Sequence, residues 1–152
     1  MFGLTTLGLI HTVISLIAIG AGIVALLRGG ISPRTGAGQL YLLCTILTAA
    51  TALGIFRHGG FGPPHGLAIL TLVVIVAGGV ASAKKSYKLE AVAYSTTILF
   101  HLIPGVTESL TRLPPGAPIA ASPEAPIFHV LYPICLLLTI AIVVIQVRRA
   151  RG

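Results

Sequence analysis

Charge is scarce in this chain. Only 9% of its 152 residues are charged, and three of those residues are acidic. A soluble domain carries about 25% charged residues, so the composition excludes an ordinary water-soluble globular protein. Hydrophobic residues make up 55% of the chain, and the mean hydropathy is +1.01. The sequence therefore predicts that lipid is its main solvent.

Cysteine motifs and a cleavable leader are also missing. The two cysteines, Cys44 and Cys135, lie in separate apolar runs and have no CxxC spacing. This favours buried thiols over a disulfide or a zinc knuckle. The first apolar run has no basic segment before it and no small-residue cleavage site after it, so we expect it to be retained as a helix.

Five apolar runs approach the roughly 20 residues that a helix needs to cross a bilayer. We predict an all-α integral membrane protein with one domain over residues 1–152, a bundle of about five transmembrane helices. The fourth run is the weakest, because it is short and carries Glu90, Ser95 and two threonines. It is either tilted or packed inside the bundle. The predicted helices cover residues 4–27, 39–56, 66–83, 89–103 and 127–147.

The longest connection covers residues 104–126 and is rich in proline. Pro104 and Gly105 predict the end of the fourth helix. Beyond them, Glu108 and Arg112 have the i,i+4 spacing of a stabilising ion pair, which predicts a short surface helix. A strap of proline and alanine follows it.

The basic residues predict the orientation. The formal net charge is +7, but the basic residues occupy short loops between apolar runs rather than one polar face, which excludes nucleic acid as a partner. Five crossings place eight of the ten basic residues on one side, which the positive-inside rule makes cytoplasmic. We therefore predict the N-terminus outside, the C-terminus in the cytoplasm and the proline-rich loop outside. The eight are Arg28, Arg34, Lys84, Lys85, Lys88, Arg148, Arg149 and Arg151.

Two residues on this side receive structural interpretations. Glu90 begins the fourth helix, where the helix dipole favours an acid, and we predict that it pairs with Lys88 or with the turn at Lys84 and Lys85. Tyr41 fits the aromatic belt at the inner interface.

Small and hydroxyl residues predict how the helices pack. Glycine and alanine clusters, with Gly22 and Gly78 among them, predict close approach of the first three helices. Thr45, Thr48 and Thr51 recur at every third position. They predict a hydroxyl seam, for which helix–helix bonding is the favoured interpretation.

All five histidines fall on the outer side of this topology. His11 and His101 are the deepest and lie at similar depth on different helices. Neutral imidazole suits zinc, copper and haem iron, so we predict His11 and His101 as cofactor-binding residues, with haem b as one candidate. The competing interpretation is a hydrogen bond between helices.

A shallower metal site is predicted at the outer rim, with His65, His129 and Glu108 as ligands of copper or zinc. The spacing from His58 to His65 is not HxxxH, so no local motif supports this set. His58 is instead interpreted as a solvated loop residue, and His129 has an alternative role as an interfacial anchor.

Two segments carry a resemblance. They are RTGAGQLY, which starts at Arg34, and FGPPHGLAILTL, which starts at Phe61. Over about residues 8–80 the chain resembles a broad family of small bacterial predicted membrane proteins of unknown function. The resemblance implies a bacterial inner (cytoplasmic) membrane, and His11 and His65 match the family pattern. A family histidine is replaced here by Pro33. Compact haem bundles such as cytochrome b561 are similar in architecture only.

The leading functional hypothesis is that the outer histidines bind haem b or a copper or zinc ion, and for haem the role is electron transfer between a membrane quinol and a periplasmic acceptor. The alternative is a non-catalytic membrane subunit or assembly factor that docks on a larger membrane complex. A transporter is disfavoured, because the centre of the bilayer holds no charged residue and no inverted repeat is visible. The partners considered are the lipid bilayer, a quinol, a larger complex and a second copy of the chain.

Overall fold

The computed structural model describes residues 5–56 and 60–150. Within these ranges the chain forms α-helices and no strand. Each helix is long and apolar enough to cross a membrane, which confirms the all-α part of the predicted fold class and the five potential membrane spans. The helices are α1 (Thr6–Leu27), α2 (Gly36–Leu53), α3 (Pro63–Ala83), α4 (Tyr87–Arg112) and α5 (Phe128–Arg149).

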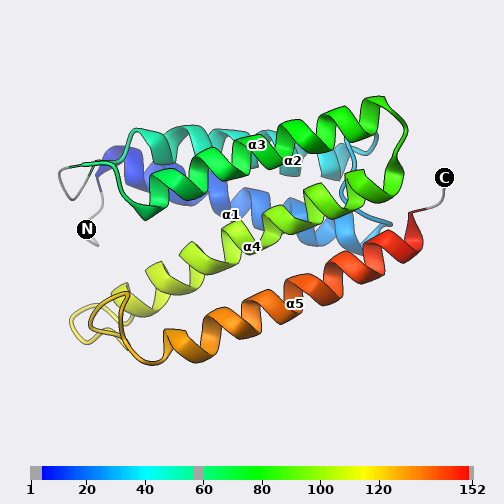
Figure 1. Cartoon of the computed structure of the whole chain (residues 1–152). Helices are drawn as coiled ribbons and strands as arrows, with labels where there is room; N and C mark the ends of the chain where they lie inside the picture. The colour runs from blue at the N-terminus through cyan, green and yellow to red at the C-terminus, as the bar shows by residue number, and fades with distance from the viewer. Residues whose placement is uncertain (1–4, 57–59, 151–152) are drawn as a thin grey trace.

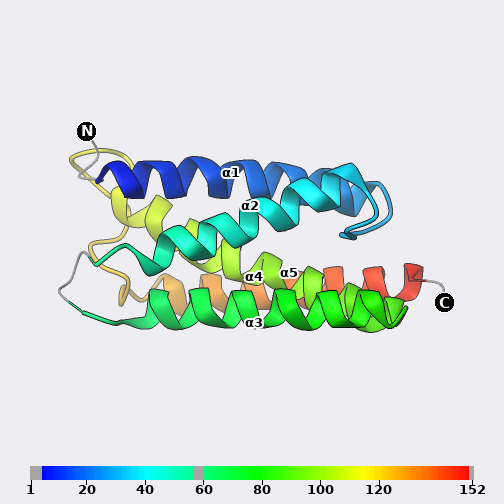
Figure 2. The same cartoon turned by 90° about the horizontal axis from the view of Figure 1, so that it is seen from above.

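The helices run up and down, so the chain ends lie at opposite ends of the bundle (Figures 1 and 2). One end holds the α1–α2 loop, the α3–α4 turn and the C-terminal turn of α5. We name it the basic end, because it carries the described members of the predicted basic cluster, which are Arg28, Arg34, Lys84, Lys85, Lys88, Arg148 and Arg149. The eighth member, Arg151, lies outside the described residues.

Local chemistry sets where the helices begin. The hydroxyl of Thr5 accepts a hydrogen bond from the Gly8 amide (3.1 Å), and that of Thr35 accepts one from the Gly38 amide (3.2 Å). Such caps satisfy amides that have no partner inside the helix. Because Thr35 caps α2, this helix begins at Gly36, three residues before the predicted start.

Helix α4 differs most from the prediction. It passes through Pro104 and ends at Arg112, so the predicted fourth helix and the short surface helix are one element. Pro104 has no N–H, so the carbonyl of Phe100, four residues earlier, loses its helical donor. Prolines are nevertheless tolerated inside membrane helices, and α4 continues past this one to Arg112.

Helix α4 is also the centre of the bundle. It packs against α1, α3 and α5, and hydrogen bonds from its Thr97 and His101 side chains reach α2. The mean hydropathy over its membrane-length stretch is 1.3, the lowest value among these helices. Because it packs against several neighbours, five of its side chains with polar groups are buried in protein, namely Glu90, Tyr94, Ser95, Thr97 and His101. Of the two predicted alternatives, packing inside the bundle is confirmed.

Glycines allow two tyrosine rings to enter the core. A Cβ atom added at Gly22 would lie 2.8 Å from the ring of Tyr41, and one added at Gly78 would overlap the ring of Tyr94. The prediction of close approach at small residues is confirmed here. The belt position predicted for Tyr41 is wrong, because its side chain is 1% exposed and lies in the core.

Helix α5 packs mainly on α4. Near the end opposite the basic end, the hydroxyls of Thr107 and Tyr132 lie 2.8 Å apart. At the basic end, the Arg149 guanidinium donates to the Leu26 carbonyl of α1 (3.3 Å). These two contacts fix how α5 lies against the rest of the bundle.

Candidate functional site

His101 lies in a buried hydrogen-bond network between three helices. Its Nδ1 atom is 3.1 Å from the Ser15 hydroxyl of α1, and its Nε2 atom is 3.1 Å from the Thr45 hydroxyl of α2. Thr45 donates its single proton to the Tyr41 carbonyl (2.7 Å), so toward His101 it accepts. Nε2 of His101 therefore carries the proton, and Nδ1 accepts from Ser15. Both ring nitrogens have partners.

His11 belongs to the same region, because it lies one helical turn from Ser15 on α1. Its Nδ1 atom is 3.0 Å from both the Thr48 carbonyl and the Thr51 hydroxyl of α2. A carbonyl only accepts, so Nδ1 carries the proton. This leaves the lone pair of the neutral ring on Nε2. The structure thus brings His11 and His101 together, as the sequence predicted.

This geometry bears on the predicted haem. Two axial ligands must each direct a nitrogen lone pair at the iron from opposite faces of the ring. The lone pair of His101 is on Nδ1 and is directed at Ser15. The residues as packed therefore do not fit a haem held by both histidines. His11 does fit one metal bond through Nε2, since ligating histidines usually donate their other N–H to a carbonyl or carboxylate.

The other predicted metal ligands lie apart. His65 is buried at the start of α3, where its ring packs against Phe56 and Phe61 with centroid separations of 4.7 and 5.2 Å. Its Nδ1 atom accepts from the Gly62 amide (3.2 Å). His129 is exposed in the first turn of α5.

Glu108 completes the predicted rim set. Its carboxylate forms the predicted i,i+4 ion pair with Arg112. In the part of the chain that the structure describes, no three His, Cys, Asp or Glu side chains are placed to hold one metal ion. His58 lies outside the described residues.

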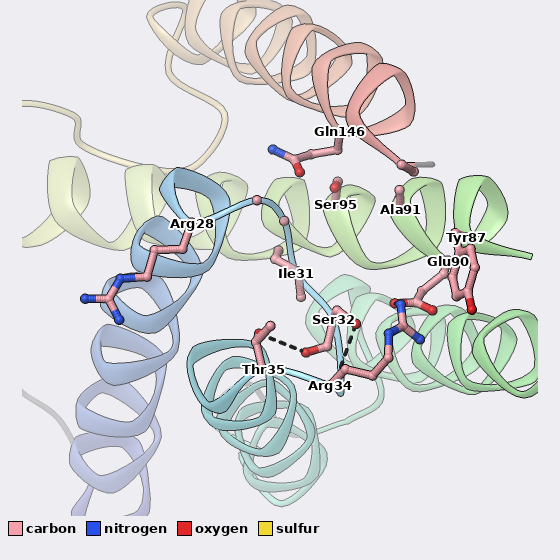
Figure 3. A pocket seen from close by; sticks show the side chains of 13 residues that line it. Arg28, Ile31, Ser32, Arg34, Thr35, Tyr87, Glu90, Ala91, Ser95 and Gln146 are labelled. Atoms are coloured by element: carbon pink, nitrogen blue, oxygen red, sulfur yellow. Dashed lines mark hydrogen bonds and ion pairs between the residues drawn. The ribbon is translucent and has the colours of Figure 1, made fainter. Parts of the chain in front are cut away.

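A different group of residues surrounds a cavity of about 350 Å³ at the basic end (Figure 3). The α1–α2 loop, the first turns of α4 and the last turn of α5 form its walls. The side chains that matter below are Arg34, Glu90, Ser95 and Gln146, and we name the cavity the Glu90 pocket. Pockets that bind small molecules occupy about 300–1,000 Å³, so its size suits a ligand.

Arg34 holds one side of Glu90. Its guanidinium donates to Glu90 Oε1 (2.7 Å) and to the Ser82 hydroxyl (3.1 Å), and it lies over the Tyr87 ring, 4.8 Å from the centroid. The predicted pairing of Glu90 with a lysine is wrong. The α1–α2 loop carries Arg34 directly over the start of α4, whereas the lysines of the turn are exposed.

Two buried oxygens in the pocket are left without partners. Glu90 is 2% exposed and Ser95 is 1% exposed. Neither Glu90 Oε2 nor Ser95 Oγ has a hydrogen-bond partner among the residues that the structure describes. Buried polar atoms without partners are rare in folded proteins, because each costs about 1–3 kcal/mol. This pair marks the pocket as the best candidate site.

Gln146 forms the third polar wall. It is buried on α5 and faces Ser95 across the pocket (Figure 3). The α1–α2 loop passes close to this side chain: a Cβ atom added at Gly30 would lie 2.5 Å from Gln146 Oε1. Gly30 also has φ +130°, a conformation that favours glycine. A glycine at this position therefore lets the loop close over Gln146.

The sequence analysis did not identify this site. The site could have been found from the polar residues inside the apolar runs, since polar residues within membrane spans are functional candidates by default. Glu90 was predicted only as a structural partner of a lysine, Ser95 was noted only as weakening the fourth helix, and Gln146 near the end of the fifth run was not noted. Comparisons with protein families, curated proteins and solved structures find no match for this chain.

Proposed function

We propose that this chain is a multi-pass protein of the bacterial inner membrane that binds a small polar ligand in the Glu90 pocket. The basic end faces the cytoplasm in this proposal, in accord with the positive-inside rule. One observation carries the proposal: two of the residues that line a cavity large enough for a ligand, Glu90 and Ser95, each hold a buried oxygen without a partner. A bound molecule that supplies their hydrogen bonds removes the cost of burying them.

The test is native mass spectrometry of the full-length protein released from bacterial membranes. Wild type is expected to carry a bound small molecule or lipid at near-stoichiometric level. Ser95→Leu fills the pocket with an apolar side chain and is expected to lose the adduct. Thr96→Leu is the matched control, because Thr96 is half-buried and its hydroxyl donates only to the Val92 carbonyl of its own helix. Equal adducts in all three proteins would contradict the proposal.

A second candidate function keeps the predicted metal chemistry at His11. The observation in its favour is the Nδ1–H bond to the Thr48 carbonyl, which leaves Nε2 as a donor for a copper or zinc ion. Such an ion would supply Lewis acidity or, for copper, one-electron chemistry. Elemental analysis and the absorption spectrum of the purified protein test it. Stoichiometric metal that His11→Ala loses supports this function, and a colourless, metal-free wild type contradicts it.

A further inference from the structure

The Glu90 pocket carries an inference about its ligand, which rests on the proposed function. The first constraint is Glu90 Oε2. A carboxylate oxygen only accepts hydrogen bonds, so the ligand must bring a donor to it. Arg34 already occupies Oε1, which leaves Oε2 as the oxygen open to a ligand. The strongest partner for the remaining oxygen is a cationic N–H group.

The second constraint is the arrangement of the polar groups along the bundle. Ser95 lies five residues further into α4 than Glu90, or roughly 7.5 Å deeper at 1.5 Å per residue. The Ser95 hydroxyl and the Gln146 amide face each other at this deeper level (Figure 3). Both groups donate as well as accept hydrogen bonds. The pocket thus offers an acceptor near the mouth and donors below it.

The third constraint is charge. The described part of the basic end carries seven cations, two of which, Arg28 and Arg34, line the pocket. Arg28 is exposed and points away from Glu90 (Figure 3), so its long side chain is free to meet an anion at the rim. The surrounding basic residues would repel a ligand that carries only a positive charge, and the Glu90 carboxylate would repel one that carries only a negative charge. A zwitterion carries a cation for Glu90 and an anion for the basic residues.

We propose that the ligand is an aminophospholipid, bound by its headgroup. Its primary ammonium donates to Glu90 Oε2, its ester oxygens accept from Ser95 and Gln146, and its phosphate, which lies between these groups in the lipid, is the anion that Arg28 meets. In a cytoplasmic leaflet the ammonium of such a lipid is its outermost group and the ester oxygens lie deeper. The order from Glu90 to Ser95 along α4 matches this polarity.

The test is competitive lipid binding to the delipidated full-length protein, read by native mass spectrometry. The probes are phosphatidylethanolamine, phosphatidylcholine and phosphatidylglycerol with identical acyl chains, in equal amounts. Choline has no N–H donor and glycerol has no cation, so both are matched controls for the ammonium. Wild type is expected to retain phosphatidylethanolamine about tenfold over either, the factor of one charge-assisted hydrogen bond.

Variants place the effect at the pocket. Glu90→Gln is expected to lower the preference for phosphatidylethanolamine to about onefold, because the amide binds an ammonium more weakly. Ser95→Ala leaves the Arg34–Glu90 pair intact and is expected to weaken binding of all three lipids, which keeps the proposal testable should Glu90→Gln fail to fold. Ser82→Ala is the control: Ser82 accepts from Arg34 outside the pocket, and the preference should be unchanged.

The outcomes separate this inference from the proposed function. If the three lipids are retained equally and Ser95→Leu loses all of them, the proposal of an aminophospholipid is overturned and the pocket remains a ligand site. Equal retention that Ser95→Leu does not change overturns both. Soluble O-phosphoethanolamine distinguishes the source of the zwitterion: displacement of phosphatidylethanolamine at equal concentration identifies a free metabolite and overturns the lipid, whereas no displacement supports it.

Discussion

At the scale of single residues, His101 and the Glu90 pocket differ in how their buried polar atoms are paired. Each ring nitrogen of His101 meets a hydroxyl from another helix. One oxygen of Glu90 and the hydroxyl of Ser95 lack partners within the described chain, as do Thr48 Oγ1 and His65 Nε2 elsewhere. Only the Glu90 and Ser95 atoms belong to residues that line the cavity, so we interpret His101 as fixing the helices and these two residues as awaiting a ligand.

The paired glycines Gly78 and Gly79 give a residue-scale prediction. A Cβ atom at Gly78 would overlap the buried ring of Tyr94, whereas one at Gly79 would come no closer than 3.9 Å, to the Tyr94 hydroxyl. Gly78→Ala is expected to destabilise the protein by about 1–3 kcal/mol, the usual cost of overpacking. Thermal unfolding in detergent, followed by circular dichroism, measures it.

Gly79→Ala is the control for this substitution. It changes the same backbone by the same atom, and alanine favours helix by about 1 kcal/mol over glycine. An unchanged or raised melting temperature is expected. Equal effects of the two substitutions would show that Tyr94 does not pack against Gly78 as described.

At the scale of helices, α4 shows which features the sequence predicts correctly and which it does not. Hydropathy and loop composition identified every helix, because an apolar run of about 20 residues has few alternatives in a membrane. The end of α4 was predicted wrongly at Pro104, because a proline removes only one hydrogen bond of the helix and α4 continues through it to Arg112. The similar depth of His11 and His101 was predictable from their positions in the predicted helices, whereas the hydrogen-bond partners of the two side chains were not.

Thr96 and Thr97 give a prediction for the polar face of α4. Thr97 donates to the Tyr94 carbonyl and accepts from the Tyr41 hydroxyl (both 2.6 Å), and it is fully buried. Thr97→Val leaves the buried Tyr41 hydroxyl without its acceptor. We expect a loss of about 0.6–1.7 kcal/mol, the range of interhelical hydrogen bonds in membranes.

Thr96→Val provides the reference for that loss. Thr96 is half-buried and bonds only within α4, so its replacement should change stability by less than about 0.5 kcal/mol. Both variants are compared with wild type by reversible unfolding in mixed detergent. A Thr97→Val variant as stable as Thr96→Val would contradict the central position of α4.

At the scale of the whole molecule, charge and cavity lie at the same end. The basic end carries the residues from which orientation is predicted, and it also carries the Glu90 pocket. The gathering of the basic residues at one end was predictable from five crossings, and the orientation that the positive-inside rule derives from it stays a prediction. The pocket was not, because it forms where the α1–α2 loop, α4 and α5 converge, and the contacts of a loop with distant helices leave no periodic pattern in a sequence. The resemblance to small bacterial membrane proteins stays a prediction.

The most direct test of this account is the reactivity of a cysteine placed in the pocket. Ala91 lines the pocket and is half-buried, so Ala91→Cys is treated with a charged, membrane-impermeant thiol reagent in inside-out and right-side-out membrane vesicles. The wild-type cysteines, Cys44 and Cys135, are buried, so labelling of the wild-type protein gives the background rate. We predict faster labelling of Ala91→Cys than of wild type from the cytoplasmic face only, slowed when phosphatidylethanolamine is added. Labelling no faster than wild type, or labelling from the outer face, would contradict an open pocket at a cytoplasmic basic end.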